Sequence, residues 1–585
     1  MAKQQKWGGD RATWASIAGG ILLAVFPINA RAQIAGDGTL GSQVNGSLTA
    51  PCTGTCIITN GTTRGSNLFH SFRQFSLPNG DLAGFITTPT IQNVIVRVTG
   101  IGQPFISNIN GTIATSNPAN FFLLNPNGII FGPDTRLFNG GAFLATTAER
   151  MLFQDGTVFD SRNQTSASLL TVSVPIGLQF GKSPGEIRSS ALIGAGINSL
   201  FTDFALVGGD VTLDGSAIVA PGQRIEIAGV DGNSQVELRL NGNNLSLNMA
   251  SDTARRDITL LNGTLIDVST SNVGGDVAIT GRNIRFNQSA VFAGILPGID
   301  NAATNRAGDI VINATANLQL TQKSGLINQI EDGAIGQGGN TRVTATNVQM
   351  QNGSAIVAST FGLGNAGNLQ VVANAIALDS DSGIQSAVGS SGSGQGGSVT
   401  LQTRSLMLKN GGSVGTTTAG IGNAGQVKVT ADTIILDSRG GIFGQVASTG
   451  TGRGGDITIQ SRSLTLTNAA SVSSNTFGIG NGGNITVATG SLSVSGGSAI
   501  DAGTFGNGNG GNVRVTANSI ALDGTTPDSQ FVSGIGSQVR GTASGRGGDV
   551  TVEANSLTIT NGANISASTF GNGNGGNVRV TANSI

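Results

Sequence analysis

A corner made of a small residue, a glycine, a polar residue and an apolar residue returns along this chain from residue 200 onward. Its glycine stands at positions 209, 275, 308, 339, 367, 397, 425, 455, 483, 511, 548 and 576. From 308 onward most steps are 28 to 31 residues long, with one of 37, and residues 504–520 recur identically at 569–585. A period of this length is typical of a solenoid, in which each repeat is one structural unit stacked on the next.

Apolar and polar residues alternate with a period of two inside each repeat, which predicts β-strands. In the repeat that starts at Gly455, one face carries Ile457, Ile459, Leu464, Leu466 and Val472. The next repeat has apolar residues at the same offsets 28 residues later, namely Ile485, Val487, Leu492, Val494 and Ile500. We expect three short strands per repeat, separated by Gly, Asn and Ser corners.

A single repeat is too small to be stable alone. Burying about six apolar side chains yields about 1.5–3 kcal/mol each, whereas ordering each residue costs about 1.5 kcal/mol. Stacked coils overcome this deficit because their backbones pair and their apolar positions form a continuous core. The sequence therefore predicts an all-β parallel β-helix with one coil per repeat. A β-propeller is the alternative, although its blades need about 40 residues and four strands.

The composition agrees with a glycine-punctuated β-protein and excludes several other classes. Gly accounts for 92 of 585 residues without the third-position period of collagen, and charged residues are 11% of the chain. Disordered chains combine low hydropathy with high net charge, whereas mean hydropathy here is +0.10 and the formal net charge is −1. That near-neutral balance also gives no electrostatic basis for binding nucleic acid or an anionic membrane.

The N-terminus has the pattern of a secretory signal peptide. A basic start precedes an apolar run from Ile17 to Phe26, and Ala30-Arg31-Ala32 supplies a small-x-small cleavage site. We therefore expect residues 1–32 to be a signal peptide that is cleaved between Ala32 and Gln33. A membrane anchor is the alternative, but the run falls short of the about 20 residues that a bilayer requires.

The chain has two cysteines, Cys52 and Cys56, and both lie in the expected mature protein. In an oxidising compartment we expect them to pair across a small loop, with free thiols as the alternative. A metal site would need more ligands than the one histidine, His70, can add.

Apolar runs at 121–124 and 129–131 flank the turn Asn125-Pro126-Asn127-Gly128. Pro126 presets φ for the first corner, and Asn127-Gly128 tolerate the positive φ that follows. Between an apparent signal and hundreds of residues of β repeat, this turn and Ile129 resemble the Asn-Pro-Asn-Gly-Ile motif of two-partner secretion exoproteins, the filamentous-haemagglutinin-like family. Three further segments match that family, namely Gly-Asp-Gly-Thr at 36–39, Leu-Phe-His-Ser-Phe at 68–72 and Asn-Gly-Thr-Ile at 110–113.

The resemblance implies a domain order and an export route. Residues 33–205 would be the secretion, or haemagglutination-activity, domain, folded as a capped, right-handed β-helix. Residues 206–585 would be β-helical repeats of about 28–31 residues that continue beyond the given chain. Periplasmic domains of a partner outer-membrane β-barrel transporter would recognise the secretion domain, and the protein would reach the surface or medium of a Gram-negative-type cell.

Within the motif, the resemblance implies that Asn125, Pro126, Asn127, Gly128 and Ile129 form a turn that secretion needs. We expect them to hold fold and register first, with transporter contact second. The family's earlier Asn-Pro-Asn-Leu motif has no clear copy, and Gly102-Gln103-Pro104 stands near its place.

Members of this family are often adhesins, so the resemblance implies that the exported protein is an adhesin, with host or cell-surface glycans as candidate ligands. A passive stalk for a further C-terminal domain and a polysaccharide-processing β-helix enzyme are the alternatives. An enzyme would need paired carboxylates or a similar cluster on one face. Acidic and neutral polar residues interchange at the repeat corners, which favours a role in turn formation over one in catalysis. Examples are Asp456, Asn484, Ser398 and Gln426. We therefore expect no catalytic residue, no cofactor and no metal ion. The candidate carboxylates are Asp210, Asp214, Asp231, Asp257, Asp267, Asp276, Asp549 and the pair Glu331-Asp332.

Overall fold

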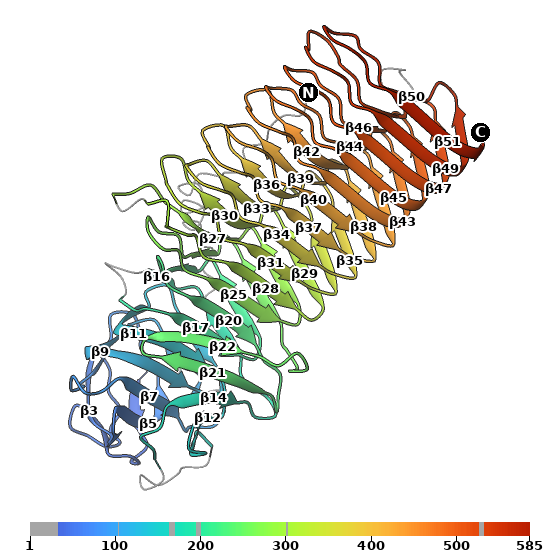
Figure 1. Ribbon diagram of the computed structural model, residues 1–585. Helices are drawn as coiled ribbons and strands as arrows, with labels where there is room; N and C mark the ends of the chain where they lie inside the picture. The colour runs from blue at the N-terminus through green and yellow to red at the C-terminus, as the bar shows by residue number, and fades with distance from the viewer. Residues whose placement is uncertain (1–32, 103–104, 163–169, 195–199, 300–301, 526–531) are drawn as a thin grey trace. The chain divides into compact units, whose positions relative to one another are not determined.

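The computed structural model describes residues 33–102, 105–162, 170–194, 200–299, 302–525 and 532–585 (Figure 1). The expected signal peptide, Ala32 included, and Gln103-Pro104 lie outside these described residues. Every regular element in the described ranges is a β-strand, so they contain no helix long and apolar enough to cross a membrane. The chain divides into two compact units. Unit 1 comprises Met1–Val268, Gly275–Val291 and Asn313–Thr315, and unit 2 comprises Ser269–Gly274, Phe292–Ile312 and Ala316–Ile585.

Unit 1 is a stack of coils whose first coil is covered by antiparallel strands. One face runs in parallel pairs through β5 (Asn67–Phe75), β7 (Asn93–Val98), β9 (Thr112–Leu124), β11 (Arg136–Thr146), β17 (Phe204–Gly208) and β20 (Ile225–Gly229). At the start of the stack, β1 (Ile34–Gly36) and β4 (Thr62–Arg64) pair antiparallel with β5, and β2 (Ser42–Val44) with β3 (Thr55–Asn60). We call residues 34–64, which contain β1 to β4, the cap. Its strand pairs occupy edges that would otherwise be open to another chain.

Phenylalanine rings stack through the interior of unit 1. The parallel register places Phe121 opposite Phe143, and Phe143 opposite Phe204. Their ring centroids are 5.8 Å and 5.7 Å apart and the rings are nearly parallel. All three side chains are buried. The stacked rings therefore link three successive coils. Phe121 precedes the Asn125 turn in the chain, and the other two rings follow it.

A five-stranded antiparallel sheet lies outside the coils of unit 1. Its strands, in order, are β13 (Val158–Asp160), β12 (Arg150–Phe153), β14 (Pro175–Gln179), β21 (Gln235–Asn241) and β22 (Asn244–Asn248). Its inner face adds Met151, Phe159 and Leu178 to a buried cluster with Phe69 and Phe122 of the coils. The repeat pattern did not predict this outer sheet, because its strands are inserted between coil strands.

Two carboxylates hold the free edge of β22 to the coils. The amide N–H of Leu245 donates to Asp203 Oδ2 (2.7 Å), and that of Leu247 donates to Glu226 Oε2 (3.1 Å). Arg224 joins the two acids, since its backbone N–H donates to Asp203 Oδ1 and its Nε to Glu226 Oε1. Burial raises the pKa of both carboxyls, and the hydrogen bonds and Arg224 offset this only in part.

Replacing Asp203 with asparagine should remove part of the pH dependence of stability. Folding raises the pKa of this carboxyl above its ordinary value of 3.8, so the unfolded chain ionises first as the pH rises. The ionised group therefore disfavours the folded state at neutral pH, and acidification removes that effect. We expect the unfolding free energy of Asp203→Asn, relative to the wild type, to rise between about pH 4 and pH 7 in urea titrations. Exposed Asp134→Asn is the control, and a pH-independent difference for Asp203→Asn would contradict the prediction.

Each coil of unit 2 contributes strands that pair in parallel with those of the next coil (Figure 1). One coil consists of β34 (Leu369–Val372), β35 (Ala375–Leu378) and β36 (Gly383–Val388), and the next of β37 (Val399–Gln402), β38 (Ser405–Lys409) and β39 (Ser413–Thr418). The register keeps equivalent positions in line, so that buried Leu378 opposes Leu408, which opposes Leu436. The predicted all-β parallel β-helix is therefore confirmed.

Further strands of unit 2 are β30 (Gly325–Ile330), β31 (Thr341–Thr344), β32 (Asn347–Met350), β33 (Ala355–Thr360), β40 (Val427–Thr430), β41 (Thr433–Asp437), β42 (Gly441–Val446), β46 (Ala499–Asp501), β47 (Val513–Asp523), β48 (Gly534–Gly536), β49 (Val550–Thr560), β50 (Asn564–Ser566) and β51 (Val578–Ser584).

The repeat at Gly455 departs from the three predicted strands. Its first two strands form one, β43 (Ile457–Thr467), which is followed by β44 (Ser471–Ser473). The corner between the two expected strands, residues 460–463, stays extended. Pairing with β45 (Ile485–Ser495) consequently continues through it, with Ser461 opposite Thr489 and Ser463 opposite Ser491.

Stacking explains why the repeat corner is always glycine. A Cβ at Gly367 would overlap the carbonyl oxygen of Gly339, the corner glycine one coil earlier. The same overlap with the preceding corner glycine recurs at Gly397, Gly425, Gly455, Gly483, Gly511, Gly548 and Gly576. Each corner lies directly against the corner of the preceding coil, with no room for a side chain.

Candidate functional site

The Asn125 motif is a tight turn between β9 and β10 (Ile129–Phe131). The N–H of Gly128 donates to the carbonyl oxygen of Asn125 (3.1 Å), which closes a four-residue turn with Pro126 in second place. Positive φ falls on Gly128, at 129°, and not on Asn127. The fixed φ of proline suits the second position of such a turn, and glycine suits the left-handed conformation.

Asn125 is fully buried, and its side chain holds the preceding coil. Its Nδ2 donates to the carbonyl oxygen of Phe105 (2.8 Å) and to Ser107 Oγ (2.9 Å). Its Oδ1 accepts the backbone N–H of Asn127 (3.1 Å) and one proton of the Asn127 amide (2.8 Å). Both ends of this side chain are therefore used, so that an apolar replacement leaves several buried polar groups without partners.

Asn127 extends the same network to the segment at 100–102. Its Nδ2 donates to the carbonyl oxygen of Gly100 (2.8 Å), and its Oδ1 accepts the N–H of Gly102 (3.0 Å). The guanidinium of Arg162 also donates to Asn127 Oδ1 (3.3 Å). Gly102 belongs to the segment that stands near the place of the family's earlier motif.

The following coil packs against the turn from the other side. Gly185 N–H donates to the carbonyl oxygen of Pro126 (3.1 Å), and Ile129 N–H to that of Glu186 (3.1 Å). A Cβ on Gly185 would lie 2.5 Å from the nitrogen of Gly128, so the two backbones are in direct contact. Buried Ile129 pairs in parallel with both Ser107 and Ile187. The motif thus joins three successive coils, and Asn125, Pro126, Gly128 and Ile129 are buried.

A buried arginine near this region was missed by the sequence reasoning. Arg97 is 0% exposed, donates through Nε to Ser71 Oγ (2.8 Å) and through Nη1 to the carbonyl oxygen of Asp160 (2.6 Å), and lies over the ring of Phe159. Burial lowers its pKa, and the charges of Asp37 and Asp160 oppose that shift. Val94, Val96 and Val98 alternate with Arg97, so the sequence alone assigns the arginine to a solvent face. The outer sheet covers that face.

Asp37, from the Gly-Asp-Gly-Thr segment at 36–39, belongs to the same network. Its Oδ2 accepts hydrogen bonds from Ser71 Oγ (2.6 Å) and Thr99 Oγ1 (2.9 Å). Burial by itself would raise its pKa, but these hydrogen bonds and those from Thr39 together lower it. The segment therefore has a structural role that links the cap to the first coils.

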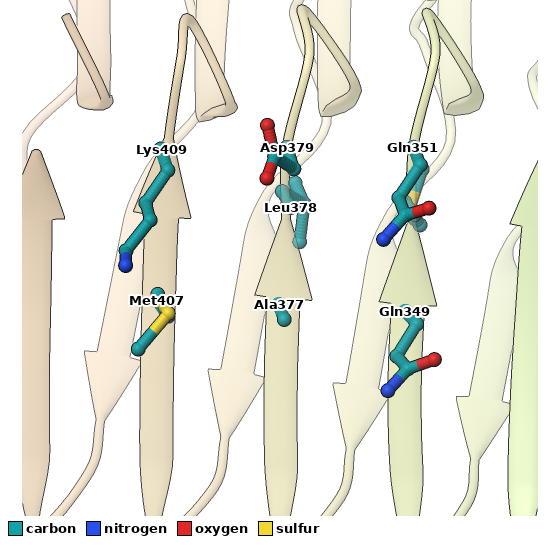
Figure 2. A pocket seen from close by; sticks show the side chains of 8 residues that line it. Gln349, Gln351, Ala377, Leu378, Asp379, Met407 and Lys409 are labelled. Atoms are coloured by element: carbon teal, nitrogen blue, oxygen red, sulfur yellow. The ribbon is translucent and has the colours of Figure 1, made fainter. Parts of the chain in front are cut away.

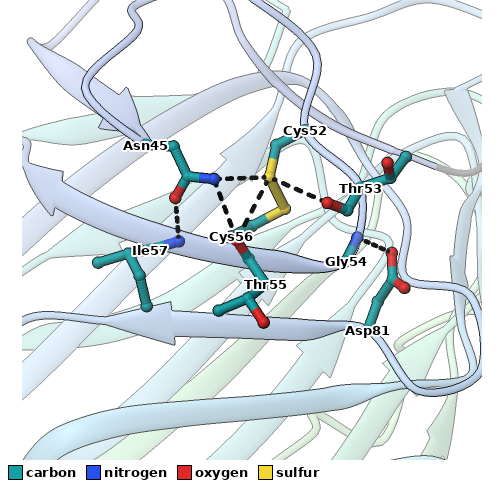
Figure 3. The surroundings of a disulfide bond; sticks show 8 residues. All are labelled: Asn45, Cys52, Thr53, Gly54, Thr55, Cys56, Ile57 and Asp81. Carbon is teal, nitrogen blue, oxygen red and sulfur yellow. Dashed lines mark hydrogen bonds between the residues drawn. A yellow bond between two sulfur atoms is a disulfide. The ribbon is translucent and has the colours of Figure 1, made fainter.

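Cys52 and Cys56 form a disulfide in the cap (Figure 3). Asn45 braces the bridge, because its Nδ2 donates to Cys52 Sγ (3.3 Å) and its Oδ1 accepts the N–H of Ile57 (2.8 Å). Within the same loop, Gly54 N–H donates to Asp81 Oδ2 (2.7 Å). The backbone of Cys52 also exchanges two hydrogen bonds with Ile34, near the expected mature N-terminus at Gln33.

His70, on β5, lies in an aromatic core next to the cap. Its Nδ1 is 3.2 Å from Ser42 Oγ, and its ring contacts Phe85 edge-on at 5.3 Å. Burial lowers its pKa to about 3. The imidazole is therefore neutral at physiological pH, and it serves packing better than proton transfer.

The carboxylates at the repeat corners bind the next coil. Asp456 Oδ1 accepts the N–H of Asn484 (2.7 Å), and Asp549 Oδ1 accepts that of Asn577 (2.9 Å). In unit 1, Asp210 Oδ1 likewise accepts the N–H of Asp257 (3.0 Å). Within the described residues, no group of three or more His, Cys, Asp or Glu side chains is arranged to hold a metal ion. These carboxylates therefore serve as hydrogen-bond acceptors that join the corner of one coil to the backbone of the next.

Figure 2 shows a shallow notch on the outer face of unit 2. It forms where Ala377 stands between the longer side chains of Gln349 and Met407 on neighbouring coils. Its acid, Asp379, accepts a hydrogen bond from Asn410 Nδ2 (2.9 Å), which lowers its pKa. A carboxylate in this state does not serve as a proton donor at neutral pH.

Comparison with known proteins gives one family. A model described as the TPS secretion domain matches residues 32–279, a range that contains the Asn125 turn, both cysteines and the outer sheet. The structure is also similar to the crystal structure of the HMW1 secretion domain from Haemophilus influenzae, at 16% sequence identity and a TM-score of 0.41, covering 74% of this chain and 96% of that chain. None of the curated proteins matches the sequence. The matched family is a secretion domain and not an enzyme family. Residues 32–279 of this chain therefore match the secretion domain of two-partner secretion exoproteins.

Proposed function

We propose that the chain is exported through a partner outer-membrane β-barrel transporter whose periplasmic domains recognise unit 1. The observation that carries this proposal is the secretion-domain match over residues 32–279. In this scheme residues 1–32 are a signal peptide cleaved between Ala32 and Gln33, residues 33–205 are the non-repeating part of the secretion domain, and residues 206–585 are the repeats. The route crosses the periplasm and ends at the cell surface or in the medium.

The Asn125 motif contributes to export by holding the recognised domain in its fold. Its side chains bind residues 100–102 and 105–107 of the preceding coil, and its backbone binds Gly185 and Glu186 of the following coil. Because most of the motif is buried, a transporter would contact its neighbours and not the motif itself.

For the exported repeats we propose an adhesin role, with host or cell-surface glycans as ligands. The engagement of the corner carboxylates in coil-to-coil hydrogen bonds supports a binding role over a polysaccharide-processing one. A glycan array probed with the whole exported chain tests this. Saturable binding to a defined glycan class is expected, and an array without binding would favour the passive stalk.

Export itself is tested by expressing residues 1–585 in the native cell with and without the partner transporter gene. We expect the protein to be lost from surface and medium, and retained or degraded in the periplasm, when the transporter is missing. Equal surface levels in the two strains would contradict the proposed route.

A further inference from the structure

A regular row of exposed aliphatic side chains runs along one edge of unit 2. It lies in the loops that follow β33, β36, β39, β42 and β44. Single parallel bridges there join, in order, Leu363, Ser393, Ile421, Thr451 and Ile479. The three aliphatic residues are 53%, 65% and 56% exposed. Aliphatic and hydroxyl side chains therefore alternate from coil to coil, and we call this set of five residues the alternating row.

Backbone hydrogen bonds between coils fix the spacing of the alternating row. Ile421 N–H donates to the carbonyl oxygen of Gly392 (2.9 Å), and Gly422 N–H donates to that of Thr451 (2.8 Å). Bonds of the same kind recur at each coil of the row. Because paired strands lie about 4.8 Å apart, the aliphatic residues recur about every 9.6 Å, once in two coils.

Exposed amides accompany the aliphatic residues on the same coils. Each aliphatic residue is followed two positions later by an exposed asparagine, namely Asn365, Asn423 or Asn481. Oδ1 of Asn423 accepts the N–H of Arg453 (2.8 Å), and Oδ1 of Asn481 accepts that of Asn509 (2.9 Å). Since the oxygen of each amide is engaged in this way, its NH2 group is the part that can donate to a ligand.

The charge of this edge suits a neutral ligand. The edge consists of the corner segments 363–365, 393–395, 421–423, 451–453 and 479–481. Their one charged residue, Arg453, forms an ion pair with Asp456 (2.5 Å). The edge thus offers amides, hydroxyls and aliphatic groups, whereas a polyanion would require basic side chains that are not already paired.

The spacing of the alternating row favours a sugar chain over a protein as its ligand. Protein interfaces have a contiguous apolar core, whereas aliphatic side chains about 9.6 Å apart do not touch one another. Two sugars of an extended β-1,4-linked chain span nearly this distance. Successive sugars in such a chain are turned over, so that a given side of the chain repeats once in two sugars, as the row repeats once in two coils.

We propose that the edge formed by Leu363, Ile421 and Ile479 binds a neutral, extended β-1,4-linked polysaccharide that lies along the stack of coils. The C–H groups of alternate sugar rings would pack on the aliphatic side chains, and their hydroxyl oxygens would accept hydrogen bonds from the asparagine NH2 groups. Phe477, which is 40% exposed, adds an aromatic ring to the last coil of the row. This inference deepens the adhesin role proposed for the repeats and rests on it.

Titration calorimetry of the purified exported chain with cellohexaose tests the site. We expect saturable binding by the wild type and at least tenfold weaker binding by Leu363→Ser/Ile421→Ser/Ile479→Ser. The melting temperature should not change, because serine already occupies the equivalent position at Ser393. No binding of cellohexaose, or equal affinity of the wild type and the triple variant, would overturn the proposal.

Two controls test the specificity of the binding. Val311→Ser/Ile559→Ser replaces exposed aliphatic residues of unit 2 outside the alternating row, so its affinity should equal that of the wild type. Maltohexaose has the same sugar in a curved, α-linked chain without the two-sugar repeat, and it should not bind. Equal affinity for the two oligosaccharides would overturn the match between coil spacing and chain repeat.

The glycan array with the whole exported chain separates failure of this site from failure of the adhesin role. Binding of another glycan class that the triple variant retains would overturn the site alone. An array without binding to either protein would overturn both. A dimer in sedimentation that the triple variant loses would assign the edge to a second copy of the chain, and would also overturn the polysaccharide proposal.

Discussion

Replacing Asn125 with alanine should destabilise the secretion domain by about 3 kcal/mol and reduce export several-fold. The substitution removes the donor to the carbonyl oxygen of Phe105 and to Ser107 Oγ, and the acceptor of Asn127 N–H. All of these groups would lose their partner inside the stack of coils. The double variant Asn125→Ala/Asn127→Ala should lower stability and export further, because residues 100–102 then also lose their hydrogen bonds to the turn. Surface protein and the urea midpoint of unfolding are the measurements.

The chain contains its own control for this experiment. The tripeptide Pro-Asn-Gly of the motif recurs at 78–80, where Asn79 is exposed. Asn79→Ala makes the same chemical change at a surface corner, so we expect stability within about 0.5 kcal/mol of the wild type and normal export. Equal effects of Asn79→Ala and Asn125→Ala, or normal surface levels of Asn125→Ala, would rule out the turn as a coil-joining element.

The two Pro-Asn-Gly segments also show what the sequence could and could not predict. Local propensity predicts a turn at both, and a turn forms at both. Their different burial depends on residues far along the chain, since Gly100 binds the side chain of Asn127 and Gly185 binds the carbonyl oxygen of Pro126 in one of them. Spacing within a five-residue motif contains no information about such partners. The family resemblance indicated that secretion needs the motif, and the structure shows which residues the motif contacts.

The repeats could be predicted in much greater detail than unit 1. Period-two alternation repeated at fixed offsets determines which side chains point inward, and Leu378, Leu408 and Leu436 are buried in line as such a pattern requires. The outer sheet of unit 1 has no repeat, so neither its existence nor the burial of Arg97 beneath it follows from periodicity. Stacking contacts between coils, such as those of the corner glycines, likewise require the register of two coils at once.

Replacing Gly367 with alanine should cost about 3 kcal/mol and open the coils on either side of it. The added Cβ would overlap the carbonyl oxygen of Gly339, which is backbone and cannot move aside without separating two coils. Because a solenoid is stabilised by contacts between nearest neighbours, the damage should stay local. Hydrogen exchange should therefore accelerate in residues 339–397 and change little beyond residue 455.

Gly383→Ala is the matched control in the same unit, and it tests whether the stacking contact or the loss of glycine is responsible. A Cβ there meets only the movable side-chain ends of Gln385 and Ser413, both at 3.2 Å, as its nearest neighbours. Parallel pairing places Ala355, one coil earlier, and Ala499, four coils later, at the position equivalent to Gly383. Alanine therefore fits the local backbone. We expect a change within about 0.5 kcal/mol. If Gly367→Ala were as mild as Gly383→Ala, neighbouring corners could separate to admit a side chain, and direct contact between corners would not explain the invariant glycine of the repeat.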